Sequence, residues 1–412
     1  MWKFVLFIFI VLQGCAKSNH EPAPQNSSNK EIDSNRIKFE TSIKQVESAQ
    51  STPPLSVDFS GQFLTRPSNE TTIHKKQKKH ITEILDTLEN NVLAVWGEQE
   101  KKISNKIQII KYLDGYKTRA IIDFEKGEII VETINIDDEL GTIHNSVRAT
   151  FNLPADLDSA NIFDDNTSLP ITESGLLLEG LITDAQGNSI TPRNRLEKKV
   201  KEITNDDIKK RKSIIKGKSQ EITYVKIPLA KNYLQKLAQK YKPEVLKYSN
   251  EYNMDPELVF AVIKTESSFN PLAISPVPAY GLMQLVPTTG GRDAYKHAKS
   301  RDIIPSKEYL FDAKNNIELG TAYLNLVKFT YLKLIQDEIS RELCTIASYN
   351  TGTGNVFKTF GKSKKMAIKR INALSAEEVY NILITKLPYA ETRNYVKKVI
   401  KARSQFLKFS II

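Results

Sequence analysis

At 412 residues, the chain is long enough for two or three domains that each bury a core of their own. Its 40% hydrophobic and 26% charged residues are ordinary for globular protein and exclude a collagen-like or wholly disordered chain. The 59 Lys and Arg outnumber the 48 Asp and Glu, and the net charge of +11 favours an anionic partner such as nucleic acid, a membrane surface or an anionic polymer.

Residues 1–15, MWKFVLFIFIVLQGC, predict a secretory signal, because one positive charge precedes an apolar core too short to span a membrane comfortably. The end, L-x-G-C, resembles the cleavage box of bacterial lipoproteins, which implies a lipid on Cys15, and Ala16 after it implies sorting to the outer membrane. An uncleaved anchor, or an ordinary signal with a chance cysteine, is the alternative. Export leaves the cell wall and anionic lipid as partners and argues against nucleic acid.

Residues 16–72 are rich in Ser, Asn, Pro and Gln, and such a composition cannot bury enough apolar surface to offset chain entropy. We expect a flexible tether here. The one other cysteine, Cys344, lies in an apolar run and is predicted to be a small core residue. If Cys15 is acylated, no disulfide can form within the chain.

Residues 73–230 predict a mixed α/β domain. A helical spacing of apolar residues runs through HITEILDTLENNVLAVWG, and TRAIIDFEKGEIIVETI predicts a hairpin around Lys126 and Gly127. GLLLEGLITDAQGNSI, residues 175–190, predicts a second strand pair. The basic run at 198–218 is interpreted as a solvated helix face, with a polymer-binding surface as the alternative. No catalytic constellation is visible in this domain, which we interpret as a positioning or wall-binding module.

Residues 231–412 predict an almost wholly helical domain. Apolar-periodic segments of helix length alternate with prolines that should lie between helices. These prolines are Pro243, Pro256, Pro271, Pro287, Pro305 and Pro388. The fold class is therefore α+β multidomain, with the mixed domain first and an all-α domain after it.

Glu266 is the first candidate catalytic residue. Asp255 and Pro256 predict a helix start, and in the following ELVFAVIKTES the carboxylate falls on the apolar stripe while Lys264 falls on the wet face. Desolvation raises a carboxyl pKa, so such a group can donate a proton near neutral pH and later take one back. The alternative is that Glu266 is the frayed, exposed end of the helix.

Further motifs follow Glu266 in a fixed order: Ser275, then Gln284 in GLMQLVPTT, then ASYNTGTGNV, then PYAETRNYVKKV. The last two carry Tyr349 with Asn350 and Glu391 with Tyr395, and the latter pair should share one helix face. Each motif alone could be an ordinary surface or core residue. Together and in this order they resemble the lysozyme-like lytic transglycosylases of bacterial cell walls, over the whole second domain.

The resemblance implies a goose-type lysozyme-like fold, peptidoglycan glycan strands as substrate, and Glu266 as acid and then base. It implies cleavage of the MurNAc-β-1,4-GlcNAc bond without water, giving 1,6-anhydro-MurNAc ends. It also implies a set of residues that line the sugar subsites or support them: Ser275, Gln284, Tyr349, Asn350, Glu391 and Tyr395. Pro278 and Tyr280 depart from the family pattern beside the GLMQ turn.

No cofactor and no metal are expected, since the five His residues show no ligand spacing. Two other functions stay open. One is a lysozyme that hydrolyses the same bond with Glu266 as acid and an unidentified base, since a glycosidase normally uses two carboxylates. The other is a non-catalytic lipoprotein that holds glycan strands, although such a protein has no need of a desolvated acid.

Overall fold

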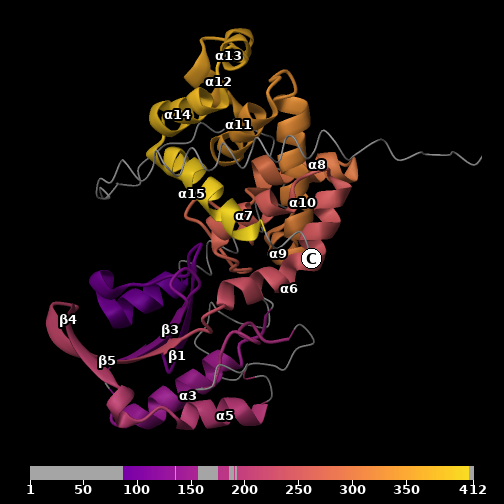
Figure 1. The fold of residues 1–412 in the computed structure, drawn as a ribbon. Coiled ribbons are helices and arrows are strands. Elements are labelled where there is room, and N and C mark those ends of the chain that lie inside the picture. The colour runs from indigo at the N-terminus through magenta and orange to yellow at the C-terminus, as the bar shows by residue number, and fades with distance from the viewer. Residues whose placement is uncertain (1–86, 135, 156–174, 185–189, 191–192, 408–412) are drawn as a thin grey trace, which may run out of the picture. The chain divides into compact units, whose positions relative to one another are not determined.

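The computed structural model describes residues 87–134, 136–155, 175–184, 190 and 193–407. The predicted signal segment, Cys15 and the predicted tether lie outside these residues. Figure 1 shows the described part as a sheet with accompanying helices followed by a helical domain. The α+β fold class predicted from sequence is confirmed.

The sheet has five antiparallel strands in the order β1-β2-β3-β5-β4. The strands are β1 (Gln108–Leu113), β2 (Thr118–Asp123), β3 (Glu128–Thr133), β4 (Lys209–Ile215) and β5 (Lys218–Pro228). The predicted hairpin is confirmed, since β2 and β3 pair on either side of the turn that holds Lys126 and Gly127. A second hairpin joins β4 to β5 through Lys216 and Gly217, both at positive φ, as a two-residue turn requires.

Helical backbone covers residues 87–100, and its apolar side chains Leu88, Val92 and Trp96 pack on Ile110 and Tyr112 of β1. Helix α3 (Glu139–Phe151) contacts β2, β3 and β5. A shorter helix, α5 (Arg193–Lys201), packs against α3. The sheet is therefore held by helices on which apolar residues recur at helix spacing, as expected for a mixed layer.

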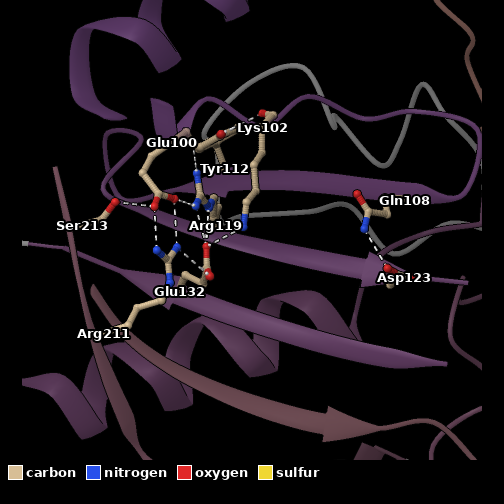
Figure 2. Close-up of polar contacts among 9 residues, drawn as sticks. All are labelled: Glu100, Lys102, Gln108, Tyr112, Arg119, Asp123, Glu132, Arg211 and Ser213. Atoms are coloured by element: carbon tan, nitrogen blue, oxygen red, sulfur yellow. Dashed lines mark hydrogen bonds and ion pairs between the residues drawn. The ribbon is translucent and has the colours of Figure 1, made fainter. Parts of the chain in front are cut away.

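A buried charge cluster ties the helix at 87–100 to three strands (Figure 2). The side chain of Arg119 in β2 is 0% exposed, donates from Nε to Glu132 Oε2 at 2.7 Å and from Nη2 to Glu100 Oε2 at 3.0 Å, and stacks 3.7 Å from the Trp96 ring. Arg211 of β4 donates to Glu100 Oε1 at 2.6 Å and to Glu132 Oε1 at 3.2 Å. Each carboxylate is hydrogen-bonded to both arginines, so the buried charges are paired and the cluster holds the helix to the strands.

Two sequence predictions for this domain were wrong. Residues 175–184 form turns and isolated bridges in place of a strand, and the turn expected at 186–188 lies outside the described residues. The basic run at 198–218 is not one helix, because α5 ends at Lys201, a 3₁₀ turn follows at Asn205–Asp207, and the remainder forms β4 and the start of β5.

The described part of the second domain is mostly helical, as predicted. Its helices are α6 (Tyr233–Glu251), α7 (Pro256–Ser267), α8 (Arg292–Lys299), α9 (Lys307–Phe311), α10 (Ala313–Asn325), α11 (Glu338–Thr351), α12 (Thr353–Phe360), α13 (Lys364–Ile371), α14 (Ala376–Lys386) and α15 (Ala390–Phe406). Wide π-helical turns cover Pro287–Gly291 and Leu326–Tyr331. Pro243 lies inside α6 and not between helices, which corrects the sequence prediction for that proline.

Helix α7 is the centre of this domain and lies beside α15 (Figure 1). All residues from Leu258 to Ile263 are buried, so the helix is apolar all round, as a core helix should be. Phe260 stacks on Phe406 of α15 with ring centroids 5.3 Å apart. Asp255 is the N-cap residue as predicted, but its carboxylate accepts a hydrogen bond from Arg403 of α15 at 3.0 Å and none from the helix N-terminus. These contacts fix α7 against α15.

Candidate active site

Glu266 lies in the last turn of α7 and is 5% exposed. The predicted position on the buried stripe is confirmed, and the alternative of a frayed, exposed end is wrong. Burial raises the pKa of this carboxyl above its usual value, because the charged form loses its hydration. Lys264, expected on the wet face, is half-buried and donates to Ser268 Oγ at 3.2 Å.

The chain turns sharply after Glu266. Ser268 and Phe269 both adopt positive φ, at 51° and 66°, which is a strained conformation for residues with a side chain. Phe269 is fully buried among aromatic rings, and Ser267 Oγ donates to the carbonyl of Leu282 at 2.8 Å. Packing and this hydrogen bond therefore hold the turn, and they bring the segment after α7 beside the GLMQ loop.

Two buried tyrosines interact with the charge of Glu266. The Tyr395 hydroxyl of α15 makes no hydrogen bond of good geometry to any described residue, yet it lowers the pKa of Glu266. The pKa of Tyr395 is itself raised, first by burial and then by the charge of Glu266. Tyr349 of α11 donates to the carbonyl of Met283 at 2.7 Å, and burial followed by the charge of Glu266 raises its pKa well above the ordinary value. The Tyr395 hydroxyl can therefore donate to an acceptor in the site, whereas the Tyr349 proton is already used by the Met283 carbonyl.

Gln284 supplies an unpaired acceptor. Its side-chain nitrogen donates to the carbonyls of Ala273 and Gly281, both at 3.0 Å, so the amide nitrogen is occupied by the loop backbone. Its oxygen Oε1 is buried and has no hydrogen-bond partner among the described residues. A buried polar atom without a partner costs about 1–3 kcal/mol, a penalty that a ligand donor can remove.

Ser275 closes the loop that precedes Gln284. Its hydroxyl donates to the carbonyl of Val277 and accepts from the backbone N–H of Ala279 at 3.2 Å. Pro278 lies at the exposed tip of this turn, while Tyr280 is buried with its ring edge-on to Phe311 at 5.4 Å. The two departures from the family pattern therefore fall in different places, one on the surface and one against α9.

Asn316 of α10 fixes the GLMQ loop, a role that the sequence analysis missed. It is fully buried, accepts from the Met283 N–H at 2.7 Å, and donates to the carbonyls of Tyr280 at 2.9 Å and Leu310 at 2.6 Å. A lone Asn inside a helical pattern gives no local signal of such a role. Its three contacts become visible only when the loop and the helix are placed together.

The two later motifs meet between α11 and α15. Asn350 accepts from Thr392 Oγ1 at 2.7 Å, and Gly352 ends α11 with φ at 80°, as expected for a helix cap. Glu391, in the first turn of α15, has a side chain that is 59% exposed. Its carboxylate lies 3.9 Å from the ammonium of Lys106, which also lies 3.6 Å from Glu266.

Lys106 is the other site residue that the sequence analysis missed. It belongs to the segment between the helix at 87–100 and β1, which carries no recognisable motif.

Within the described residues, no group of three or more His, Cys, Asp or Glu side chains could hold a metal ion. None of the described helices is long and apolar enough to cross a membrane.

Comparison with known proteins gives two family matches that together cover most of the described chain. Residues 74–240 match the model described as membrane-bound lytic murein transglycosylase C, N-terminal domain, and residues 243–372 match the model of the transglycosylase SLT domain.

Cys344 is buried and forms no disulfide with a described residue, and its burial is as predicted for a core residue.

Curated relatives extend the match to nearly their whole length. Membrane-bound lytic murein transglycosylase C of Pectobacterium atrosepticum is 35% identical over 77% of this chain and 87% of its own. The protein of the same name from Yersinia pestis is 33% identical over 86% of this chain and 97% of its own. The solved structure of the 70 kDa soluble lytic transglycosylase of Escherichia coli covers 44% of this chain and 27% of its own, with 25% identity and a TM-score of 0.33.

The described chain has a sheet domain followed by a helical domain in which the buried Glu266 lies at the end of α7. The chain belongs to the family of membrane-bound lytic murein transglycosylase C.

Proposed function

We propose that this protein is a peptidoglycan lytic transglycosylase that cleaves the MurNAc-β-1,4-GlcNAc bond without water, with Glu266 as general acid and then general base. The observation that carries the proposal is the buried carboxylate of Glu266 at the end of α7, whose pKa is raised by desolvation. A raised pKa favours the protonated form of this carboxyl, which is the form that a general acid needs.

In the first step, Glu266 donates its proton to the bridging oxygen, and the bond between this oxygen and the anomeric carbon breaks. The carbonyl oxygen of the muramoyl N-acetyl group bonds to the anomeric carbon, and the GlcNAc portion leaves with a hydroxyl. In the second step the muramoyl 6-hydroxyl attacks that carbon, the bond between the N-acetyl oxygen and that carbon breaks, and the hydroxyl proton passes to Glu266. The product carries a 1,6-anhydro ring, and an internal nucleophile gains an effective molarity of about 10⁵ M or more.

The other site residues would orient the sugar. Gln284 Oε1, buried without a partner, can accept a hydrogen bond from the acetamido N–H or a sugar hydroxyl. The Tyr395 hydroxyl can donate to the Glu266 carboxylate or to the acetamido oxygen, and Tyr349 holds the GLMQ loop through the Met283 carbonyl. We propose Asn350 and Ser275 as further subsite residues through the segments they hold together.

A hydrolytic lysozyme is the second candidate, because another carboxylate is close. Glu266 and Glu391 both lie within 4 Å of the Lys106 ammonium, at 3.6 and 3.9 Å. A carboxylate on the far side of a sugar could activate a water. Glu391 is mostly exposed, however, so it lacks the water-free surroundings that would favour ring closure or tune a base.

The test is mass spectrometry of the muropeptides released from purified sacculi. Products one water lighter than reducing muropeptides are expected from the wild type. Glu266→Gln should reduce release by on the order of 10³-fold or more, because acid and base catalysis are lost together. Glu377→Gln, on the exposed first turn of α14, is the matched control and should behave as wild type. Reducing ends would establish the hydrolase, and substantial release by Glu266→Gln would refute the assignment.

For the cellular location, we propose an outer-membrane lipoprotein that faces the periplasm, anchored by a lipid on Cys15. The support is the L-x-G-C sequence at residues 12–15 and the membrane-bound relatives. Residues 16–72 would be the tether, 73–230 a positioning or wall-binding module, and 231–412 the catalytic domain. Cys15→Ser should move the protein from the membrane fraction to the soluble fraction, and unchanged membrane association would refute the lipid anchor.

A further inference from the structure

We infer that Lys106, from the domain that carries the sheet, is a positioning residue of the catalytic site that stabilises the charged form of Glu266. This inference rests on the function proposed above. It means that the sheet domain completes the active site as well as having any role in wall binding.

The Lys106 ammonium lies between two carboxylates. It is 3.6 Å from Glu266 Oε2 and 3.9 Å from Glu391 Oε1, and its side chain is 34% exposed. Glu266 is the buried partner of the two, so the interaction with Lys106 is less screened by water there than at Glu391. The cation therefore acts chiefly on the proposed acid and base.

The turn that carries Lys106 is built rigidly. Asn105 Oδ1 accepts from the N–H groups of Ile107 and Gln108, both at 3.0 Å, and the Asn105 N–H donates to the carbonyl of Gln108 at 2.9 Å. The Gln108 side chain donates to Asp123 Oδ2 at 2.7 Å, which Figure 2 shows apart from the arginine cluster. The start of β1 is thus tied to the end of β2, and the Lys106 backbone has little freedom.

The same turn touches the segment that follows the catalytic helix. Asn270 is fully buried, and its side-chain nitrogen donates to the carbonyls of Asn105 at 3.4 Å and Lys106 at 3.3 Å. Its side-chain oxygen accepts from the Leu272 N–H at 3.0 Å, so Asn270 is held from its own side too. The residue is only four positions after Glu266, which places the Lys106 backbone beside the end of α7.

The groups that face Glu266 divide into two sets. Burial raises the pKa of Glu266, and the negative charge of Glu391 from α15 raises it further. Two groups lower this pKa, first the Lys106 ammonium and then the Tyr395 hydroxyl from α15. Tyr349 from α11 also senses the charge of Glu266. Because Lys106 is the cation among these, its removal should leave the carboxylate opposed by burial and by Glu391.

The decisive experiment is the pH dependence of kcat/KM on soluble glycan strands for Lys106→Met and Lys106→Arg. An acid that must be protonated loses activity as pH rises through its pKa, so a raised pKa moves the alkaline limb upward. We expect the alkaline limb of Lys106→Met to shift upward by about one pH unit. This is the low end of the pKa shift that a nearby opposite charge causes, because Lys106 is partly exposed. Lys106→Arg should restore the wild-type limb.

Lys126→Met is the matched control, because Lys126 is an exposed lysine in the β2–β3 turn of the same domain. Its profile should match that of the wild type. If Lys106→Met does not fold, Lys106→Gln gives the same test with a polar side chain. An alkaline limb that does not move, or a rise in KM with an unchanged limb, would overturn the inference, and the latter would mean that Lys106 binds an anionic group of the substrate.

The two proposals fail separately. Activity retained in Glu266→Gln refutes the proposed acid and base, whatever the Lys106 variants do. An inactive Glu266→Gln together with an unmoved pH profile in Lys106→Met refutes the positioning role alone.

Discussion

Gly281→Ala should severely destabilise the loop that holds Gln284. Gly281 has φ at 75°, where a residue with a Cβ costs about 1–2 kcal/mol. An added Cβ would also lie 2.2 Å from the Leu310 carbonyl oxygen and 2.4 Å from Asn316 Nδ2, both closer than any real contact. Relief of this clash breaks hydrogen bonds of the buried Asn316, at about 1 kcal/mol or more each. We expect a total loss of about 3–5 kcal/mol.

Gly217→Ala separates the clash from the backbone effect. Gly217 in the β4–β5 turn has the same φ of 75°, and nothing lies within 4 Å of its added Cβ. It should lose only the backbone cost of about 1–2 kcal/mol. Urea unfolding followed by far-UV circular dichroism gives both free energies, and muropeptide release at low temperature gives activity. Equal losses in the two variants, or full activity in Gly281→Ala, would refute the loop argument.

Two further predictions concern the substrate acceptor and the buried charge cluster. Gln284→Ala should cause a partial loss of kcat/KM with muropeptide release still measurable, and wild-type kinetics would remove Gln284 from the site. The pKa of Glu100 is lowered to about 2, first by the hydrogen bond from Arg211, so its stabilisation is complete above pH 4.5 and is lost as the pH falls toward 2. The free energy of unfolding should therefore drop by about 2 kcal/mol across that window, after a discount for solvent screening, and less in Glu100→Gln. Parallel pH profiles of stability in the two proteins would contradict the role of Glu100.

Local patterns were enough to predict part of the fold. The hairpin around Gly127 and the buried stripe of α7 depend on residues close in sequence, and both predictions were confirmed. Strand β4 was missed because KKRKSII is mostly charged and lacks the apolar alternation of a half-buried strand. It is an edge strand, where lysines are common because they discourage pairing with other chains. A solvated helix face can carry the same run of lysine and arginine, so the charges alone do not distinguish a helix from an edge strand.

Tertiary contacts explain what could not be predicted at the site. The order of motifs predicted Glu266, Gln284 and Tyr349 as site residues. It gave no sign that the Gln284 amide nitrogen is bound to backbone carbonyls while its oxygen has no partner among the described residues. Asn270 reaches Lys106 across 164 positions of sequence. No periodicity carries information over such a separation, so Lys106 could be found only from the structure.

A single carboxylate that acts as acid and then as base must be stable in both forms. Burial alone would favour the protonated form of Glu266 and make loss of its proton energetically unfavourable. A cation in close contact, without burial, would favour the carboxylate over the protonated acid. The site combines the two, since desolvation dominates while Lys106 and Tyr395 oppose it. The pKa remains raised, and in the proposed mechanism the Lys106 ammonium already lies beside the negative charge that forms when Glu266 gives up its proton.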